Sequence, residues 1–124
     1  LACPENYDPD PRAMEMCARG GKGNVAVYRD PYDAARNADV LYTDVWTSMG
    51  QEEQSRERER IFKNYQINES LLQVAKKDAI VMHCLPAHRG EEITAAVIDG
   101  PQSVVIDEAE NRLHVQKAVL EILL

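Results

Sequence analysis

The stretch that decides the fold is Ile80-Val81-Met82-His83-Cys84-Leu85-Pro86-Ala87-His88-Arg89-Gly90-Glu91-Glu92. Its first half is an apolar run too short for a helix, which predicts a buried parallel strand. Pro86 ends that strand because proline cannot donate to a ladder. In open α/β sheets, ligands bind at the carboxyl ends of the strands. We therefore expect chemistry at Cys84, Leu85, His88 and Arg89.

The rest of the chain alternates between strand and helix patterns. Strands are predicted at residues 1–3, 24–28, 40–44, 80–84 and 103–107, and helices at 11–19, 32–38, 52–65, 68–77, 94–98 and from 109 onward. This alternation predicts an α/β fold, a Rossmann-like parallel sheet flanked by helices. Such a sheet normally opens with a central strand and a Gly-rich turn, which we do not find here. We interpret the chain as a fragment, with a gap expected between strands 1–3 and 40–44.

Composition excludes several classes of function. The chain has 14 Lys and Arg against 21 Asp and Glu, and its net charge of −7 argues against nucleic acid and anionic membrane as partners. No apolar run approaches the roughly 20 residues of a membrane span. The three cysteines lack CxxC spacing, which indicates free thiols in a reducing compartment, so we expect a cytoplasmic location.

Polar residues follow each of three predicted strands and should converge at one edge of the sheet. Asp44 can hold an ammonium group, or it can cap the loop that follows it. Ser48 and Met49 offer a hydroxyl and backbone N–H groups just before a helix, an arrangement suited to a carboxylate. The alternative for these two residues is a plain turn into a capped helix.

Cys84 is open to several interpretations. It can be a nucleophile, a metal ligand, a polar neighbour of an amine, or simply a small buried hydrophobe. His83 should point to the opposite face as a satisfied core histidine, whereas His88 and Arg89 can bind an anion or be solvated. We expect no metal, because these side chains lack a second cluster that would complete four ligands.

Arg112 follows the acidic run 107–110, at what we expect to be a helix start. Acidic residues suit that position because of the helix dipole, whereas arginine does not. Its planar guanidinium can reach a phosphate or a carbonyl group. The alternative is an ion pair with Glu108, one turn earlier.

Taken together, three stretches resemble ornithine carbamoyltransferases: Asp44-Val45-Trp46-Thr47-Ser48-Met49-Gly50, His83-Cys84-Leu85-Pro86 and Asp107-Glu108-Ala109-Glu110-Asn111-Arg112. The resemblance covers essentially all 124 residues, which in that family form most of the ornithine-binding domain. Aspartate carbamoyltransferases are similar in fold but lack the His-Cys-Leu-Pro stretch. Putrescine carbamoyltransferases keep that stretch but depart from the Ser-Met-Gly loop, so the resemblance implies an amino-acid acceptor.

The resemblance implies transfer of a carbamoyl group from carbamoyl phosphate to the δ-amine of L-ornithine, giving citrulline and phosphate. It places Asp44 and Ser48 at the α-ammonium group and the Met49 backbone at the α-carboxylate. Cys84 and the Leu85 carbonyl would lie beside the δ-amine. We hypothesise that a Cys84 thiolate, or a relay from Cys84 to Asp44, takes the proton of the amine.

The remaining implications concern the whole enzyme. Arg112 would contact carbamoyl phosphate, and no cofactor is expected. The carbamoyl-phosphate domain is missing, so residues 1–124 alone should be a partial, inactive ornithine-binding domain of a trimer-based homo-oligomer. One alternative is a non-catalytic amino-acid-binding module of the same fold. A dinucleotide-binding domain is disfavoured because the chain has no GxGxxG fingerprint.

Overall fold

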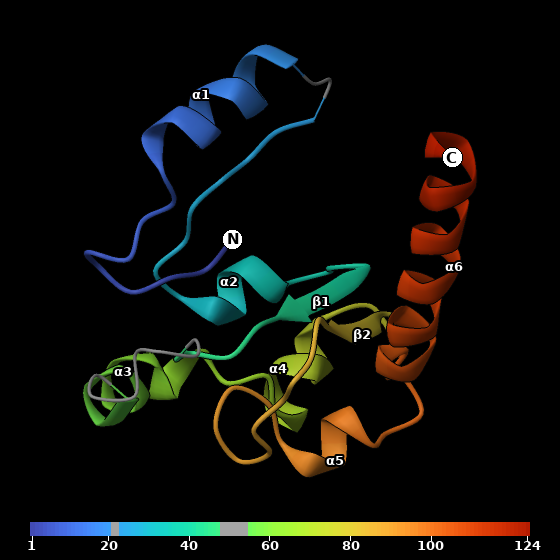
Figure 1. Ribbon diagram of the computed structural model, residues 1–124. Helices are drawn as coiled ribbons and strands as arrows, with labels where there is room; N and C mark the ends of the chain where they lie inside the picture. Colours follow the sequence, from blue (N-terminus) through green and yellow to red (C-terminus); the bar gives the residue numbers. More distant parts are fainter. Residues whose placement is uncertain (21–22, 48–54) are drawn as a thin grey trace.

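The computed structural model describes residues 1–20, 23–47 and 55–124. Its centre is a two-stranded parallel sheet formed by β1 (Val40–Thr43) and β2 (Ile80–His83) (Figure 1). The register pairs Val40 with Ile80 and Thr43 with His83, so both strands end at the same edge. Polar residues that follow the two strands are thereby brought together.

Helices surround this sheet, which confirms the predicted α/β class. In chain order they are α1 (Pro11–Gly20), α2 (Pro31–Ala35), α3 (Ser55–Phe62) with the 3₁₀ turn η2 (Lys63–Tyr65), α4 (Glu69–Val74), α5 (Ala95–Ile98) and α6 (Val105–Leu123). The short helices α2, α4 and α5 lie close to the strands, whereas α1 and the end of α6 extend away from the body (Figure 1). No helix in the described part of the chain is both long enough and apolar enough to cross a membrane.

The core lies between the sheet and the short helices. Val81 and Ile93 are fully buried at its centre. The other buried members of the same cluster are Ala35, Leu41, Ile67, Leu71, Val97, Ile98 and Val105. Burial of apolar surface of this kind supplies most of the stability of a small domain, and it fixes β2 in the middle of the packed body.

Side-chain caps define where three of the helices begin. The Asp30 carboxylate accepts from the Tyr32 amide at 2.8 Å, and the Asn68 side chain accepts from the Leu71 amide at 2.9 Å. The Thr94 hydroxyl accepts from the Val97 amide at 3.3 Å. Each bond satisfies a backbone donor that the first turn of a helix leaves free.

The predicted strand at residues 103–107 is wrong. Only Ser103 pairs there, in an isolated parallel bridge with Val81, and α6 already begins at Val105. Asp107 and Glu108 lie in the first turn of this helix, where the helix dipole favours acidic side chains. The predicted strand 24–28 is likewise reduced to a single bridge between Tyr28 and Ala2.

A cleft of about 730 Å³ separates the N-terminal segment from the sheet. Residues 1–3 line one side and residues 40–46 line the other. On the N-terminal side, the Cys3 amide donates to the Tyr28 carbonyl at 3.2 Å, and the Tyr28 amide donates to the Leu1 carbonyl at 2.8 Å. The cleft lies where the sequence predicts a gap in the sheet.

Candidate functional site

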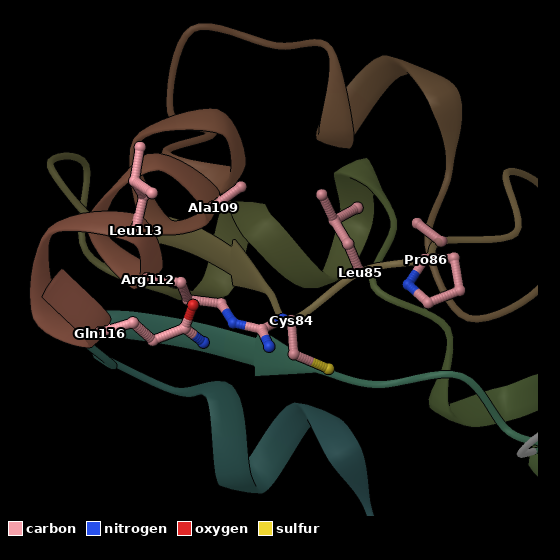
Figure 2. Close-up of a pocket in the computed structure, with 8 residues that line it drawn as sticks. Cys84, Leu85, Pro86, Ala109, Arg112, Leu113 and Gln116 are labelled. Carbon is pink, nitrogen blue, oxygen red and sulfur yellow. The ribbon is translucent and has the colours of Figure 1, made fainter. Parts of the chain in front are cut away.

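An open cleft of about 760 Å³ lies between the end of β2 and the first turns of α6 (Figure 2). One wall is formed by the loop Cys84-Leu85-Pro86-Ala87, and the other by side chains from α6, namely Ala109, Arg112, Leu113 and Gln116. Figure 2 shows the Arg112 guanidinium beside Cys84. The structure thus brings together two residues that lie 28 positions apart in the sequence.

The Cys84 thiol is partly buried and interacts with two neighbours from β1 and its end. Burial raises the pKa of Cys84, and the hydrogen-bonded Asp44 carboxylate raises it further. Loss of water around the Tyr42 hydroxyl, together with Cys84, raises the pKa of Tyr42 to about 12. Both groups therefore keep their protons at neutral pH.

Asp44 follows β1 and is exposed. Its Oδ1 accepts from the Val45 amide at 2.7 Å, so the carboxylate does cap the loop that follows it. The same carboxylate interacts with the thiol of Cys84. Asp44 therefore has a local structural role, and it lines the cleft beside the N-terminal segment, not the one that contains Arg112.

Two of the predicted site residues, Ser48 and Met49, lie outside the described residues. The convergence observed at this edge therefore involves the end of β1, the loop after β2 and the start of α6. The third of these is a helix rather than the expected strand end. Arg112 reaches the cleft from the second turn of α6.

The loop after β2 is held by a buried histidine and glutamate. The Leu85 amide donates to His83 Nδ1 at 2.9 Å, and His83 Nε2 lies 3.0 Å from Glu92 Oε1. The His88 amide donates to the same Glu92 oxygen at 2.6 Å. His83 is 1% exposed and Glu92 is fully buried, which confirms the predicted core histidine and gives it a carboxylate partner.

Glu108 links the start of α6 to the end of β2. Its Oε2 accepts from the His83 amide at 3.0 Å. Within the described ranges, no ion pair joins Glu108 to Arg112, so the guanidinium is available to the cleft. Glu108 therefore fixes the helix against the strand instead of neutralising Arg112.

Arg89 is paired with a surface carboxylate. Its Nε and Nη2 donate to Asp99 at 3.0 and 2.7 Å, and this pairing raises the pKa of Arg89 and lowers that of Asp99. Of the two alternatives left open for Arg89, anion binding and solvation, the structure shows a partly solvated guanidinium that is paired with a carboxylate of the chain itself. Both side chains are exposed, so the pair contributes little to stability.

Among the described residues, one group of side chains offers the donor atoms of a metal site. Ligand atoms of His88, Glu91 and Glu92 lie within 4.8 Å of one another. Glu92 Oε1 is already used by His83 and the His88 amide, which leaves one buried oxygen and two more exposed side chains. That set falls short of the closed four-ligand arrangement of a structural site.

Sequence reasoning missed Glu92, Tyr42 and Gln116. Glu92 reads as part of a solvated charged loop, and nothing in its immediate neighbours signals a buried carboxylate. Gln116 lies four residues after Arg112, and helical spacing from that residue would have found it. Tyr42 reads as an ordinary strand residue of β1.

Comparison with known proteins gives concordant matches. A family model described as aspartate/ornithine carbamoyltransferase, Asp/Orn binding domain, matches residues 1–123. The ornithine carbamoyltransferase of Syntrophus aciditrophicus is 68% identical over the whole chain, and that of Chlorobaculum tepidum is 58% identical over 97% of it. The chain spans 41% and 36% of the lengths of these two relatives.

Solved structures agree with this result. The ornithine carbamoyltransferase from Pyrococcus furiosus has a TM-score of 0.85 at 54% identity, covering 96% of this chain and 39% of that protein. An N-acetyl-L-ornithine transcarbamylase has the same TM-score at 33% identity, covering all of this chain and 39% of that protein. With nearly every residue matched by the family model, this chain belongs to the aspartate/ornithine carbamoyltransferase family.

Proposed function

We propose that residues 1–124 form part of the ornithine-binding domain of an ornithine carbamoyltransferase, whose carbamoyl-phosphate domain lies in another part of the full protein. The observation that supports this best is the cleft in which Cys84 and Leu85 face Arg112. An amine and a carbamoyl donor could meet between these two walls. The reaction would form a bond from the δ-nitrogen of L-ornithine to the carbonyl carbon and break the bond from that carbon to the phosphate oxygen.

Acceptor binding would fall to the end of β1 and the loop that follows it. The Asp44 carboxylate would bind the α-ammonium group with help from Ser48, and the backbone at Met49 would hold the α-carboxylate. The Leu85 carbonyl would accept a hydrogen bond from the δ-amine. A carboxylate would thus meet the α-ammonium group, backbone N–H groups would meet the α-carboxylate, and a carbonyl oxygen would meet the δ-amine.

The δ-amine must lose a proton before it can attack, since its pKa in water is near the ~10.4 of a lysine side chain. A protonated Cys84 thiol next to Asp44 suits a relay. The sulfur would accept the proton of the amine as the thiol hydrogen passes to the Asp44 carboxylate. The raised pKa of Cys84 supports this route over a pre-formed thiolate.

Arg112 would act on the carbamoyl donor. Its guanidinium presents several N–H groups in one plane, which can bind phosphate or carbonyl oxygens with two parallel hydrogen bonds. Negative charge grows on these oxygens as the tetrahedral intermediate forms and as phosphate leaves. Donors aimed at such charge lower the barrier more than they strengthen ground-state binding.

The whole-enzyme properties follow from the same proposal. We infer a homo-oligomer based on a trimer, a cytoplasmic location and no cofactor. Residues 1–124 alone would be inactive because they contain only one side of the reaction centre. A non-catalytic amino-acid-binding module of the same fold is the alternative, and it would bind ornithine without the other domain.

The test uses a composite enzyme, in which residues 1–124 replace the matching 41% of the Syntrophus aciditrophicus relative. Product formation from carbamoyl phosphate is measured with L-ornithine, N-acetyl-L-ornithine and L-aspartate as acceptors. We expect citrulline, with kcat/KM for ornithine at least ~100-fold above the other acceptors, a ratio within reach of polar recognition. A folded composite that makes no citrulline, while residues 1–124 alone bind ornithine in calorimetry, would favour the binding module.

A further inference from the structure

We propose that His83 and Glu92 are positioning residues, which set the orientation of the Leu85 backbone at the acceptor site. This inference rests on the proposed function, because it is that function which places the Leu85 carbonyl beside the δ-amine. His83 and Glu92 are buried and are not among the residues that line the cleft. Its effect on the reaction would therefore pass through Leu85.

The hydrogen bonds fix the state of the His83 ring. The Leu85 amide donates to Nδ1 at 2.9 Å, so Nδ1 acts as an acceptor and carries no hydrogen. The ring hydrogen then sits on Nε2, which faces Glu92 Oε1 at 3.0 Å. A histidine held at both nitrogens in this way has one defined tautomer and one ring orientation.

Burial makes this arrangement more than ordinary core packing. His83 and Glu92 are 1% and 0% exposed, and a buried carboxylate is unfavourable unless hydrogen bonds compensate for the lost water. Glu92 Oε1 receives two donors, from the His83 ring and the His88 amide. Among the described residues, Oε2 has no hydrogen-bond partner. Apolar side chains would fill this space at lower cost, so a polar pair here points to a requirement for orientation.

Leu85 is a residue that needs such support. Its φ is +57°, in the left-handed region that residues with a side chain rarely occupy. Conformations of this kind persist where the surroundings over-determine them, and they cluster at binding and active sites. Here the Leu85 amide is held by the His83 ring, and the His83 backbone is held by Glu108 at 3.0 Å. The bond to the Leu85 N–H holds the peptide plane between Cys84 and Leu85, and this fixes the position of the Leu85 Cα from which the carbonyl extends.

Two variants separate the two bonds of the His83 ring. In His83→Asn, the side-chain oxygen lies near the position of Nδ1 and can accept from the Leu85 amide, as in an Asx turn. In His83→Gln, the longer amide can donate to Glu92 but leaves the Leu85 amide without its acceptor. Each variant buries one amide and loses one of the two bonds, so they are matched for stability.

In the composite enzyme we expect the two variants to have similar Tm values but different activities. His83→Asn should keep kcat/KM for ornithine within about tenfold of the parent, whereas His83→Gln should lose about 100-fold or more, since small misplacements of a binding group have effects of that size. The KM for carbamoyl phosphate should change less than about threefold in both. Equal losses in the two variants, in proportion to their Tm, would mean a purely structural pair and would overturn the proposal.

A second measurement does not depend on activity. With ¹⁵N-labelled histidine and leucine, we expect the parent ring spectrum to show hydrogen on Nε2 and the Leu85 amide to exchange slowly with solvent. Exchange should stay slow in His83→Asn and become fast in His83→Gln. If the parent makes no citrulline, the proposed function fails, and these exchange rates decide alone whether His83 positions Leu85.

If neither variant folds, the ring spectrum of the parent protein decides. A His83 ring with hydrogen on Nδ1 overturns the proposal, and a ring with hydrogen only on Nε2 supports it.

Discussion

Cys84 lies between two oxygen-bearing side chains, those of Asp44 and Tyr42, at the point where the two strands end. Its burial and the neighbouring carboxylate both favour the protonated thiol. Cys17 on α1 is exposed in the same chain, which makes it a natural internal reference. The chemistry of one thiol can therefore be compared with that of another in a single sample.

We predict that iodoacetamide alkylates Cys84 slowly at pH 7 and that the rate rises with pH above 9. The thiolate is the reactive form, and the pKa of Cys84 is raised from its ordinary value of 9.0. Asp44→Asn removes a negative charge next to the thiol, so this pKa should fall and the rate at pH 8 should increase roughly three- to tenfold. Mass spectrometry of the Cys84 and Cys17 peptides measures both rates. An unchanged or slower Cys84 rate in Asp44→Asn would contradict the interaction.

A positive charge at position 112 should not be enough for full activity. Arg112→Lys keeps the positive charge but loses the planar set of donors, so we predict a fall of about 10²- to 10³-fold in kcat of the composite enzyme. Arg89→Lys is the matched control, because Arg89 pairs with the exposed Asp99. It should change kcat less than about twofold. Similar effects of the two substitutions on kcat would contradict a role for Arg112 in the reaction.

Boundaries of helices and strands could be predicted from the sequence where a single residue type, such as a capping asparagine or a proline, ends or begins an element. The helix predicted from residue 68 begins there, with Asn68 as its cap, and the strand predicted to end before Pro86 does end there. Sequence reasoning failed for Glu92, because burial of a carboxylate is decided by a partner nine residues away. The roles of Asp44, Cys84 and Arg112 stay predictions, although the cleft brings Cys84 and Arg112 together.

At the scale of elements, the start of α6 shows why one predicted strand was wrong. Val104, Val105 and Ile106 form a branched apolar run that suits a strand by propensity. Val105 instead packs into the core from the first turn of a helix. The backbone pairing with β2 is limited to one bridge, in which the Val81 amide donates to the Gln102 carbonyl and the Val104 amide donates to the Val81 carbonyl. Tertiary packing overrides propensity here, and the acidic pair that follows is the local signal for a helix start.

The turn between α5 and α6 gives a prediction about stability. A Cβ atom on Gly100 would lie 2.6 Å from the Ala96 carbonyl oxygen and 3.2 Å from that of Val97, both backbone atoms. Gly100→Ala should therefore lower the free energy of unfolding by about 1–3 kcal/mol. Gly23→Ala is the control, since a Cβ there meets nothing within 4 Å. Urea unfolding of both variants measures the difference, and equal midpoints would contradict the steric argument.

At the scale of the whole molecule, the isolated chain has two exposed apolar features. In the described part of the chain, β1 pairs with β2 alone, so its other edge is free, and Val40 on that strand is 45% exposed. The later turns of α6 also carry exposed apolar side chains, among them Leu113, Val119, Leu120, Ile122 and Leu123. An unprotected strand edge is a template for pairing with another chain.

We predict that residues 1–124 alone self-associate with increasing concentration and that Val40→Lys reduces this association, because charged side chains protect strand edges. Met16→Lys is the control. Met16 is 73% exposed on α1, a helix that lies apart from the sheet (Figure 1). Sedimentation velocity of the three proteins gives the size distributions. If Met16→Lys is as effective as Val40→Lys, general hydrophobicity and not the strand edge drives the association.

The parallel register also governs how the chain folds. Val40 pairs with Ile80, so the sheet joins segments about 40 residues apart, and the intervening chain must be brought into a closed loop before the first bond between strands can form. The entropy of closing that loop is lost before any pairing energy is gained. Helix α6, by contrast, needs only contacts within its own turns. The sheet edge that carries Cys84 is therefore expected to form late in folding, after the helices have begun to form.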